Sequence, residues 1–321
     1  MGVTLQHVII VFLASLFLIQ FSLHTWISSH HNPVSRFDSC PILNSEPKVW
    51  SAKQRRYKNR HPHHAKRCKL RRLGGHREDQ YGGWQICETE ELLVSKTANS
   101  AEDRALVYSF GLGTDTSFDE DIISQYGAVV HGFDPTPGSL KYVRERSASL
   151  PDCNFAIHPF GLNDKDGEIK LYPPENPEHI SHNQIPREGA RPVTATLLRL
   201  ATVMQLLGHT RVHILKMDVE GAEFGVLETL LSLPPLGEDD YGDGSGLSDG
   251  WAAPQRDSSG GGPDLPFDQL CVEFHPSIHP GGQEAGNAAV QRIVRALARR
   301  GFSLVHDTGA QELSFARLAV F

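Results

Sequence analysis

The chain has 321 residues, of which 39% are hydrophobic and 21% are charged, so it is long enough to bury one large core. Its net charge is −7, and the basic and acidic residues are distributed unevenly along the chain. Residues 48–77 contain twelve Lys or Arg and no acid, whereas the chain from Glu78 onward has 18 basic and 36 acidic residues. This acidic balance argues against a nucleic-acid-binding surface on the main part of the chain.

The N-terminal segment 1–27 contains the most apolar run of the chain, from Val8 to Ile27. The uninterrupted part of this run has the length of a signal-peptide core, and the whole run is barely long enough to span a bilayer. We therefore expect either a cleaved signal peptide or a single-span signal anchor. Either would deliver the rest of the chain to the secretory pathway, as a secreted protein or as a single-pass membrane protein with a luminal or extracellular domain.

Five cysteines suit that compartment, because disulfides persist in oxidising surroundings. Cys68 and Cys87 are placed to form a disulfide between the preceding stem and the main domain. For Cys153 and Cys271, burial as free thiols is an equally good explanation. An odd number of cysteines leaves at least one thiol free or intermolecular.

Residues 28–80 have few aliphatic side chains and include the basic run 48–77. This composition is typical of a solvated, low-complexity stem. The charge of the run would also suit a polyanion, such as an acidic glycan or a membrane surface. The stem carries the tract His61–His64, but no carboxylate or cysteine pattern completes a metal site, and we predict none.

The main domain is expected to span residues 81–321 and to alternate strands with helices. The predicted elements, in chain order, are a helix at 88–94, a strand at 105–110, a helix at 117–126, a strand at 128–133, a helix around Leu140 and Val143, a strand at 155–157 with a hairpin extension at 168–172, an irregular loop at 173–193, a helix at 197–207, a strand at 212–217, a helix at 224–230, a strand at 269–274, a helix at 286–300, and a closing hairpin of 302–306 with 313–321. A Gly-, Asp- and Ser-rich stretch at about 234–266 is typical of a disordered insertion. The alternation indicates an α/β fold with an open, mostly parallel sheet, helices on both faces and an antiparallel C-terminal hairpin.

The first two strands of this domain carry the pattern of a nucleoside-binding unit. Gly111 and Gly113 follow the first strand, where small residues let the backbone approach a ligand, and the next helix points its free N–H groups at the same place. Asp134 follows the second strand, 21 positions after Gly113, at the spacing expected for a carboxylate that accepts from ribose hydroxyls. Thr116 stands where a third glycine would complete a dinucleotide fingerprint, which favours a smaller adenosyl ligand over a dinucleotide.

Further polar residues follow the ends of other predicted strands. Asp115, Asp218 and His275 are each just past a strand end, and parallel strands bring their carboxyl ends to one edge of the sheet. Glu220 and Glu223 are three positions apart and would share one face of the following helix. Their alternative role is to complement the dipole at the N-terminus of that helix.

The run Lys216–Glu223, followed by Leu227 and Glu228, resembles the pattern of the FkbM-type methyltransferases. The segment Asn163–Tyr172, with its Asp-Lys-Asp-Gly turn, is similar to the third-strand region of the same family. The resemblance covers about residues 81–321. It implies the class I methyltransferase fold, a Rossmann-like open sheet, with S-adenosyl-L-methionine as the cofactor and methyl transfer to a hydroxyl or similar group.

The resemblance also assigns the cofactor-binding residues. Gly111 and Gly113 match the family's cofactor loop, while Ser109 stands at the position of its first-strand acid and Asp115 at that of its last loop glycine. Asp134 replaces the usual Glu and keeps the carboxylate for the ribose. Gly161, just after the third strand, is assigned to the same site.

Methyl transfer is an in-line displacement at a carbon that the sulfonium already activates, so positioning and desolvation supply most of the acceleration. A hydroxyl acceptor also benefits from a general base. We expect Asp218 or His275 to be that base and Glu220 to orient the acceptor, which would be a small molecule or a glycan.

Two other functions compete with this one. A domain that keeps the cofactor fold without turnover could serve as a secreted or membrane-anchored binding module, with the basic stem making the contact. A nicotinamide-dependent oxidoreductase would share the sheet but conflicts with the missing third glycine and with the motif at 216–223.

Overall fold

The computed structural model describes residues 68–76, 81–98, 103–146, 154–174, 181–233, 264–309 and 311–317, all of which belong to one compact unit that spans residues 41–321. The predicted N-terminal segment 1–27, most of the predicted stem and nearly all of the predicted insertion lie outside these residues. Within the described ranges, no helix combines the length and the apolar character needed to cross a lipid bilayer.

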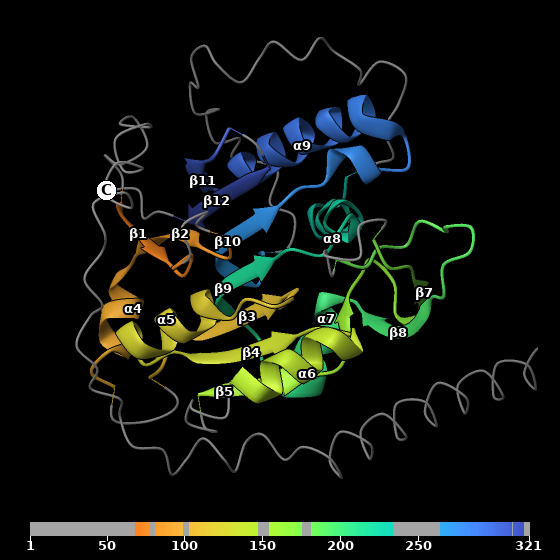
Figure 1. Ribbon diagram of the computed structural model, residues 1–321. Coiled ribbons are helices and arrows are strands. Elements are labelled where there is room, and N and C mark those ends of the chain that lie inside the picture. Colours follow the sequence, from red (N-terminus) through yellow and green to blue (C-terminus); the bar gives the residue numbers. More distant parts are fainter. Residues whose placement is uncertain are drawn as a thin grey trace, which may run out of the picture. The chain divides into compact units, whose positions relative to one another are not determined.

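The centre of the unit is a seven-stranded sheet with the order β11-β12-β10-β9-β3-β4-β5 (Figure 1). The strands are β3 (Leu106–Phe110), β4 (Val129–Phe133), β5 (Phe155–His158), β9 (Val212–Met217), β10 (Phe267–Glu273), β11 (Phe302–Asp307) and β12 (Glu312–Arg317). All neighbouring pairs from β10 to β5 are parallel, and β12 is antiparallel to both β10 and β11. This confirms the mostly parallel sheet and the closing hairpin.

The strand order reverses direction at β3. From β3 the chain moves outward through β4 to β5, and it later returns to pair β9 with the other side of β3 before moving on to β10. The carboxyl ends of β3 and β9 therefore flank a switch point, which is where open α/β sheets bind their ligands.

Two hydrophobic cores cover the two faces of the sheet because apolar side chains alternate along the strands. On β9, Leu215 belongs to the core formed with the helices α7 (Leu200–Leu207), α8 (Ala222–Leu231) and α9 (Gly282–Arg299). Ile214 belongs to the opposite core. That core is formed with α4 (Glu90–Ser95), α5 (Ser117–Tyr126) and α6 (Pro137–Arg146).

A two-stranded sheet of β1 (Lys69–Leu73) and β2 (Trp84–Glu88) packs beside the central sheet. The side-chain amide of Gln269 on β10 accepts from the Cys87 N–H and donates to the Cys87 carbonyl, both at 2.8 Å. Composition had assigned 69–73 to the stem, because its lysine and arginines suggested a solvated run. In the structure, Glu88 on the partner strand pairs with Lys69 and Arg71, so residues 69–73 are part of the fold.

The predicted disulfide between Cys68 and Cys87 is present, and it joins the start of β1 to β2. Cys271 is a buried free thiol on β10, and burial raises its pKa to about 12. A thiol held protonated in this way is unreactive.

A small sheet of the order β6-β8-β7 corrects two further predictions. It is formed by β6 (Gly161–Leu162), β7 (Gly167–Leu171) and β8 (Val193–Leu198). The strand β7 pairs antiparallel with β8 and so does not extend a hairpin with the third strand. Leu197 and Leu198 belong to β8, and α7 begins only at Leu200. Their apolar side chains fit a helix pattern as well as a strand pattern, and only the partner strands distinguish the two.

The buried His131 and His158 lie with the half-buried His209 in the core on the α7 side of β3 and β4. His131 Nδ1 is 2.9 Å from His158 Nε2, the two rings are stacked, and the His209 ring crosses the His131 ring edge-on. Burial, together with repulsion from His158 and His209, holds the pKa of His131 well below its ordinary value. His131 is therefore neutral in the folded protein at pH 7.

We predict that this histidine makes the protein sensitive to acid. Below about pH 6.5 the unfolded chain binds a proton at His131 that the folded chain excludes, so the free energy of unfolding should fall as the pH falls. Replacing His131 with Phe should flatten this decline in denaturant titrations between pH 7.5 and 5. Phe133→Leu, which perturbs the same core without removing a titrating group, should lower stability and keep the wild-type slope. An unchanged slope in His131→Phe would contradict the prediction.

Candidate functional site

The loop between β3 and α5 depends on a close backbone approach at Gly111. Gly111 has φ +77°, and a Cβ added there would lie 1.7 Å from the carbonyl oxygen of Asp218, just past the end of β9. The Gly111 N–H donates to the Phe133 carbonyl at the end of β4. Gly111 therefore joins the ends of β3, β4 and β9.

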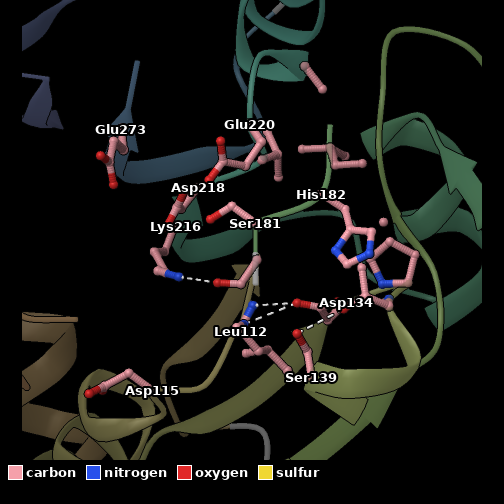
Figure 2. A pocket seen from close by; sticks show the side chains of 18 of the residues that line it. Leu112, Asp115, Asp134, Ser139, Ser181, His182, Lys216, Asp218, Glu220 and Glu273 are labelled. Atoms are coloured by element: carbon pink, nitrogen blue, oxygen red, sulfur yellow. Dashed lines mark hydrogen bonds between the residues drawn. The ribbon is translucent and has the colours of Figure 1, made fainter. Parts of the chain in front are cut away.

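Asp134 holds this loop in place from the end of β4. One carboxylate oxygen accepts from the N–H groups of Leu112 and Gly113, both at 3.1 Å. The other accepts from the N–H and the hydroxyl of Thr136, at 2.9 and 2.6 Å (Figure 2). The four acceptor positions of the carboxylate are thus all used within the protein. Its role toward a ribose stays a prediction, and a ribose hydroxyl would have to share or displace one of these bonds.

A cavity of about 180 Å³ lies over the ends of these strands. Figure 2 shows Asp134 and Ser139 at one end of it and Asp218, Glu220 and Glu273 at the other. Its side wall includes residues 181–184, which the backbone pairing of Tyr172 with Asn183 ties to the small sheet. The cavity therefore has walls from the central sheet, from the small sheet and from Tyr81, Gly82 and Trp84 at the start of β2.

The lining is strongly acidic. Seven carboxylates contribute to it, those of Asp115, Asp119, Asp134, Asp218, Glu220, Glu273 and Glu312. Among the described lining residues, Lys216 is the only lysine or arginine. Its ammonium donates to the Gly111 carbonyl at 2.6 Å and lies 5.5 Å from the centre of the Trp84 ring. Such a cavity favours ligands that carry positive charge and repels phosphates.

At the β9 end of the site, His275 lies within a ring of carboxylates. The fully buried Glu223 accepts from the His275 backbone N–H at 2.8 Å and lies 3.2 Å from Nδ1 of the same residue. The other ring nitrogen, Nε2, is 3.9 Å from Asp218, 3.6 Å from Glu220 and 3.8 Å from Glu273. Glu223 thus fixes the ring so that Nε2 faces the other three acids.

These contacts shift the pKa values of the group in opposite directions. Burial by itself would lower the pKa of His275, but the Glu223 hydrogen bond and the surrounding carboxylates raise it to about 10. Burial and the charge of Asp218 raise the pKa of Glu273 to about 7. Burial also raises the pKa of Asp218, against the attraction of Lys216. At neutral pH, His275 is an imidazolium, and Glu273 is close to its midpoint.

Ligand atoms from Asp218, Glu220 and His275 all lie within 4.8 Å of one another, so these residues could also hold a metal ion. The protonated imidazole offers a second way to compensate the same acids.

Most of the predicted site residues meet at this cavity. Gly111, Gly113, Asp115, Asp134, Gly161, Asp218 and Glu220 all line it. Ser109 and His275 are not among the lining residues: Ser109 is fully buried on β3, and His275 contacts the cavity's carboxylates.

Sequence reasoning missed several lining residues, namely Tyr81, Asp119, Ser139, Lys216, Glu273, Glu312 and the segment 181–184. Glu273 could have been predicted from the sequence, because it lies two positions before His275 at the end of the same strand. Tyr81 and residues 181–184 carried none, since they reach the site only through the packing of β2 and the small sheet.

The strand order, the glycine loop after β3 and the acids beyond β4 and β9 define the class I methyltransferase fold. Comparison with known sequences narrows the class further. The methyltransferase FkbM domain matches residues 107–304, and the chain belongs to this family.

Two curated relatives align with part of the chain. The chain is 24% identical over 148 residues to the probable methyltransferase-like protein 24 of Homo sapiens, covering 46% of this chain and 33% of that protein. The Rattus norvegicus protein of the same name is also 24% identical over 148 residues, with 34% of its length covered. The match thus spans about a third of each relative.

Solved structures resemble the chain more distantly. The methyltransferase FkbM from Methylobacillus flagellatus KT has a TM-score of 0.36 at 10% identity, covering 66% of this chain and 43% of its own. An rRNA methylase from Streptococcus thermophilus has a TM-score of 0.33 at 11% identity, covering 68% of this chain and 92% of its own.

The contact at Gly111 can be tested by substitution. Gly111→Ala should lower the free energy of unfolding by more than about 1 kcal/mol, because it combines a positive φ with a backbone clash. Gly138→Ala, in α6, is the matched control, since a Cβ there meets nothing within 4 Å, and it should be neutral or stabilising. Denaturant titration of both variants would measure the difference, and equal stabilities would refute the close approach.

Proposed function

We propose that the protein transfers a methyl group from S-adenosyl-L-methionine to a hydroxyl-type acceptor. Membership of the FkbM family supports methyl transfer. The observation that carries the choice of donor is the acidic cavity over the glycine loop. This donor brings a sulfonium and an ammonium, whereas a nicotinamide dinucleotide would bring a pyrophosphate into a lining of seven carboxylates and one lysine.

The residues at the cavity fit such a ligand. Gly111 and Gly113 keep side chains away from the loop, and Asp134 and Gly161 lie where the nucleoside end would bind. Ser109 and Asp115, also assigned to this cofactor by resemblance, lie beneath and beside the loop. When bound, the donor supplies a methyl carbon that is already activated for displacement.

The chain's own residues would then position the acceptor and take its proton. A protonated His275 cannot accept a proton, so within this proposal the base is Asp218 or Glu273, whose raised pKa values suit that task. His275 would instead hold these carboxylates in place, oriented by Glu223. Glu220, 3.6 Å from Nε2, is left to orient the acceptor.

The finer assignments remain part of the proposal. We place the protein in the secretory pathway, which the Cys68–Cys87 disulfide supports because such bonds persist in oxidising compartments. The acceptor would be a small molecule or a glycan. A polyanion contact through residues 48–77, a single membrane span within 1–27 and the alternative of an inactive binding module stay as predictions.

The decisive experiment is calorimetric titration of S-adenosyl-L-methionine into the full chain. We expect saturable binding, weakened at least tenfold in Asp134→Asn because the loop loses its anchor. Asp166→Asn is the control: this carboxylate also accepts backbone and side-chain bonds, from Arg199 and Thr202, but lies outside the cavity lining. A folded wild-type chain that binds no donor would overturn the proposal, and the binding module would replace it.

The proposed base predicts a pH dependence. With tritiated donor and an acceptor found by screening hydroxylated compounds, methyl transfer should rise as the pH passes through about 7 and Glu273 loses its proton. Glu273→Gln should cost about 100-fold or more, whereas Glu312→Gln, an acid of the same lining, should cost far less. A flat profile between pH 6 and 8, or full activity of Glu273→Gln, would exclude Glu273 and leave Asp218 as the base.

A further inference from the structure

Asp119 and Ser109 are buried polar residues near the glycine loop, and each has an oxygen atom that no well-formed hydrogen bond satisfies. Asp119, the third residue of α5, is 1% exposed, and its Oδ1 atom makes no hydrogen bond. Ser109, on β3, is fully buried, and its Oγ atom makes none either. An unsatisfied buried carboxylate oxygen is costly, and a native structure keeps one only for a reason.

The neighbouring lysine does not satisfy them. Lys216 on β9 is the register partner of Ser109 on β3, so the two residues share one face of the sheet. However, the Lys216 ammonium donates to the Gly111 carbonyl, and Asp119 Oδ1 stays without a hydrogen-bond donor. Burial raises the pKa of Asp119 to about 6, and the charge of Lys216 and the nearby Ser109 hydroxyl oppose this shift.

Both Asp119 and Lys216 line the cavity, together with Gly111 and Gly113. The Lys216 side of the loop is the side of β9, whereas Asp134 lies on the side of β4. A ligand placed across the loop would therefore meet Asp134 with one end and the pair of Asp119 and Lys216 with the other. On this side the cavity offers one carboxylate, from Asp119, and one ammonium, from Lys216. These two charges complement the ammonium and the carboxylate of an amino-acid group.

We propose that Asp119, assisted by Ser109, binds the ammonium of the amino-acid end of the methyl donor, and that Lys216 faces the carboxylate of that same end. This inference rests on the proposed function. It also explains how a chain with Ser109 at the end of its first strand still presents a carboxylate there: the acid comes from α5, ten residues later.

Three ligands test the assignment by calorimetry on the full chain. They are S-adenosyl-L-methionine, S-adenosyl-L-homocysteine and 5′-methylthioadenosine, which keeps the nucleoside and the thioether but lacks the amino-acid end. In Asp119→Asn, the dissociation constants of the first two should rise tenfold or more, because a charge-assisted bond is lost. That of methylthioadenosine should change less than twofold. Ser109→Ala should produce a smaller shift of the same pattern.

Asp121→Asn is the control on the same helix. Its carboxylate is also buried, but it accepts from the Gly74 N–H and is not part of the cavity lining. It should leave all three affinities near wild type.

The outcomes separate this inference from the function on which it rests. If Asp119→Asn weakens all three ligands equally, or weakens none, Asp119 does not bind the amino-acid end and the inference is wrong while the proposed donor stands. If the folded wild-type chain binds none of the three, the proposed function itself fails. Retained methylthioadenosine binding shows that Asp119→Asn is folded, so a loss confined to the amino-acid ligands supports the assignment.

Discussion

The close approach of Gly111 to the backbone of Asp218 is the constraint on which the rest of the site depends. It joins the ends of β3 and β9 at the point where the strand order reverses. The Gly111 N–H also donates to the Phe133 carbonyl, which connects the end of β4 to the same point. The Lys216 ammonium then caps the Gly111 carbonyl, and Asp134 takes the next two N–H groups. These bonds hold the loop in one conformation, so it can present a shaped surface to a ligand with little ordering on binding.

The electrostatics of the cavity follow from this architecture. Parallel strands direct their carboxyl ends to one edge, and the chain places an acid after β4, after β9 and at the end of β10. The surplus of negative charge is only partly balanced, by Lys216 and by the imidazolium of His275, both of which lie on the β9 side of the cavity. Burial, with the repulsion between neighbouring acids added to it, raises the pKa values of Glu273 and Asp218, so the acidic site that favours a cationic ligand also contains a proton acceptor.

The proposed donor would divide this cavity into three parts. In this proposal Asp134 and Gly161 would face the nucleoside, Asp119 and Lys216 would face the amino-acid end, and the acids around His275 would remain for the acceptor. Each part belongs to different elements, so the ligand would bridge β4, α5, β9 and β10. Substitutions in each group of residues should therefore affect a different part of binding or catalysis.

The sequence by itself determined the α/β class, the central strands, Gly111 and the acids at the strand ends, because these follow from local periodicity and from the geometry of a parallel sheet. It also identified the Cys68–Cys87 pair. It misplaced the partner of β7 and overlooked β1 and β8, whose residues are ambiguous until a neighbouring strand pairs with them. Only the tertiary structure could show that Glu273, Lys216 and Asp119 share one cavity, or that His275 is charged. Those properties arise from burial and from contacts between residues distant along the chain, and local sequence carries no record of either.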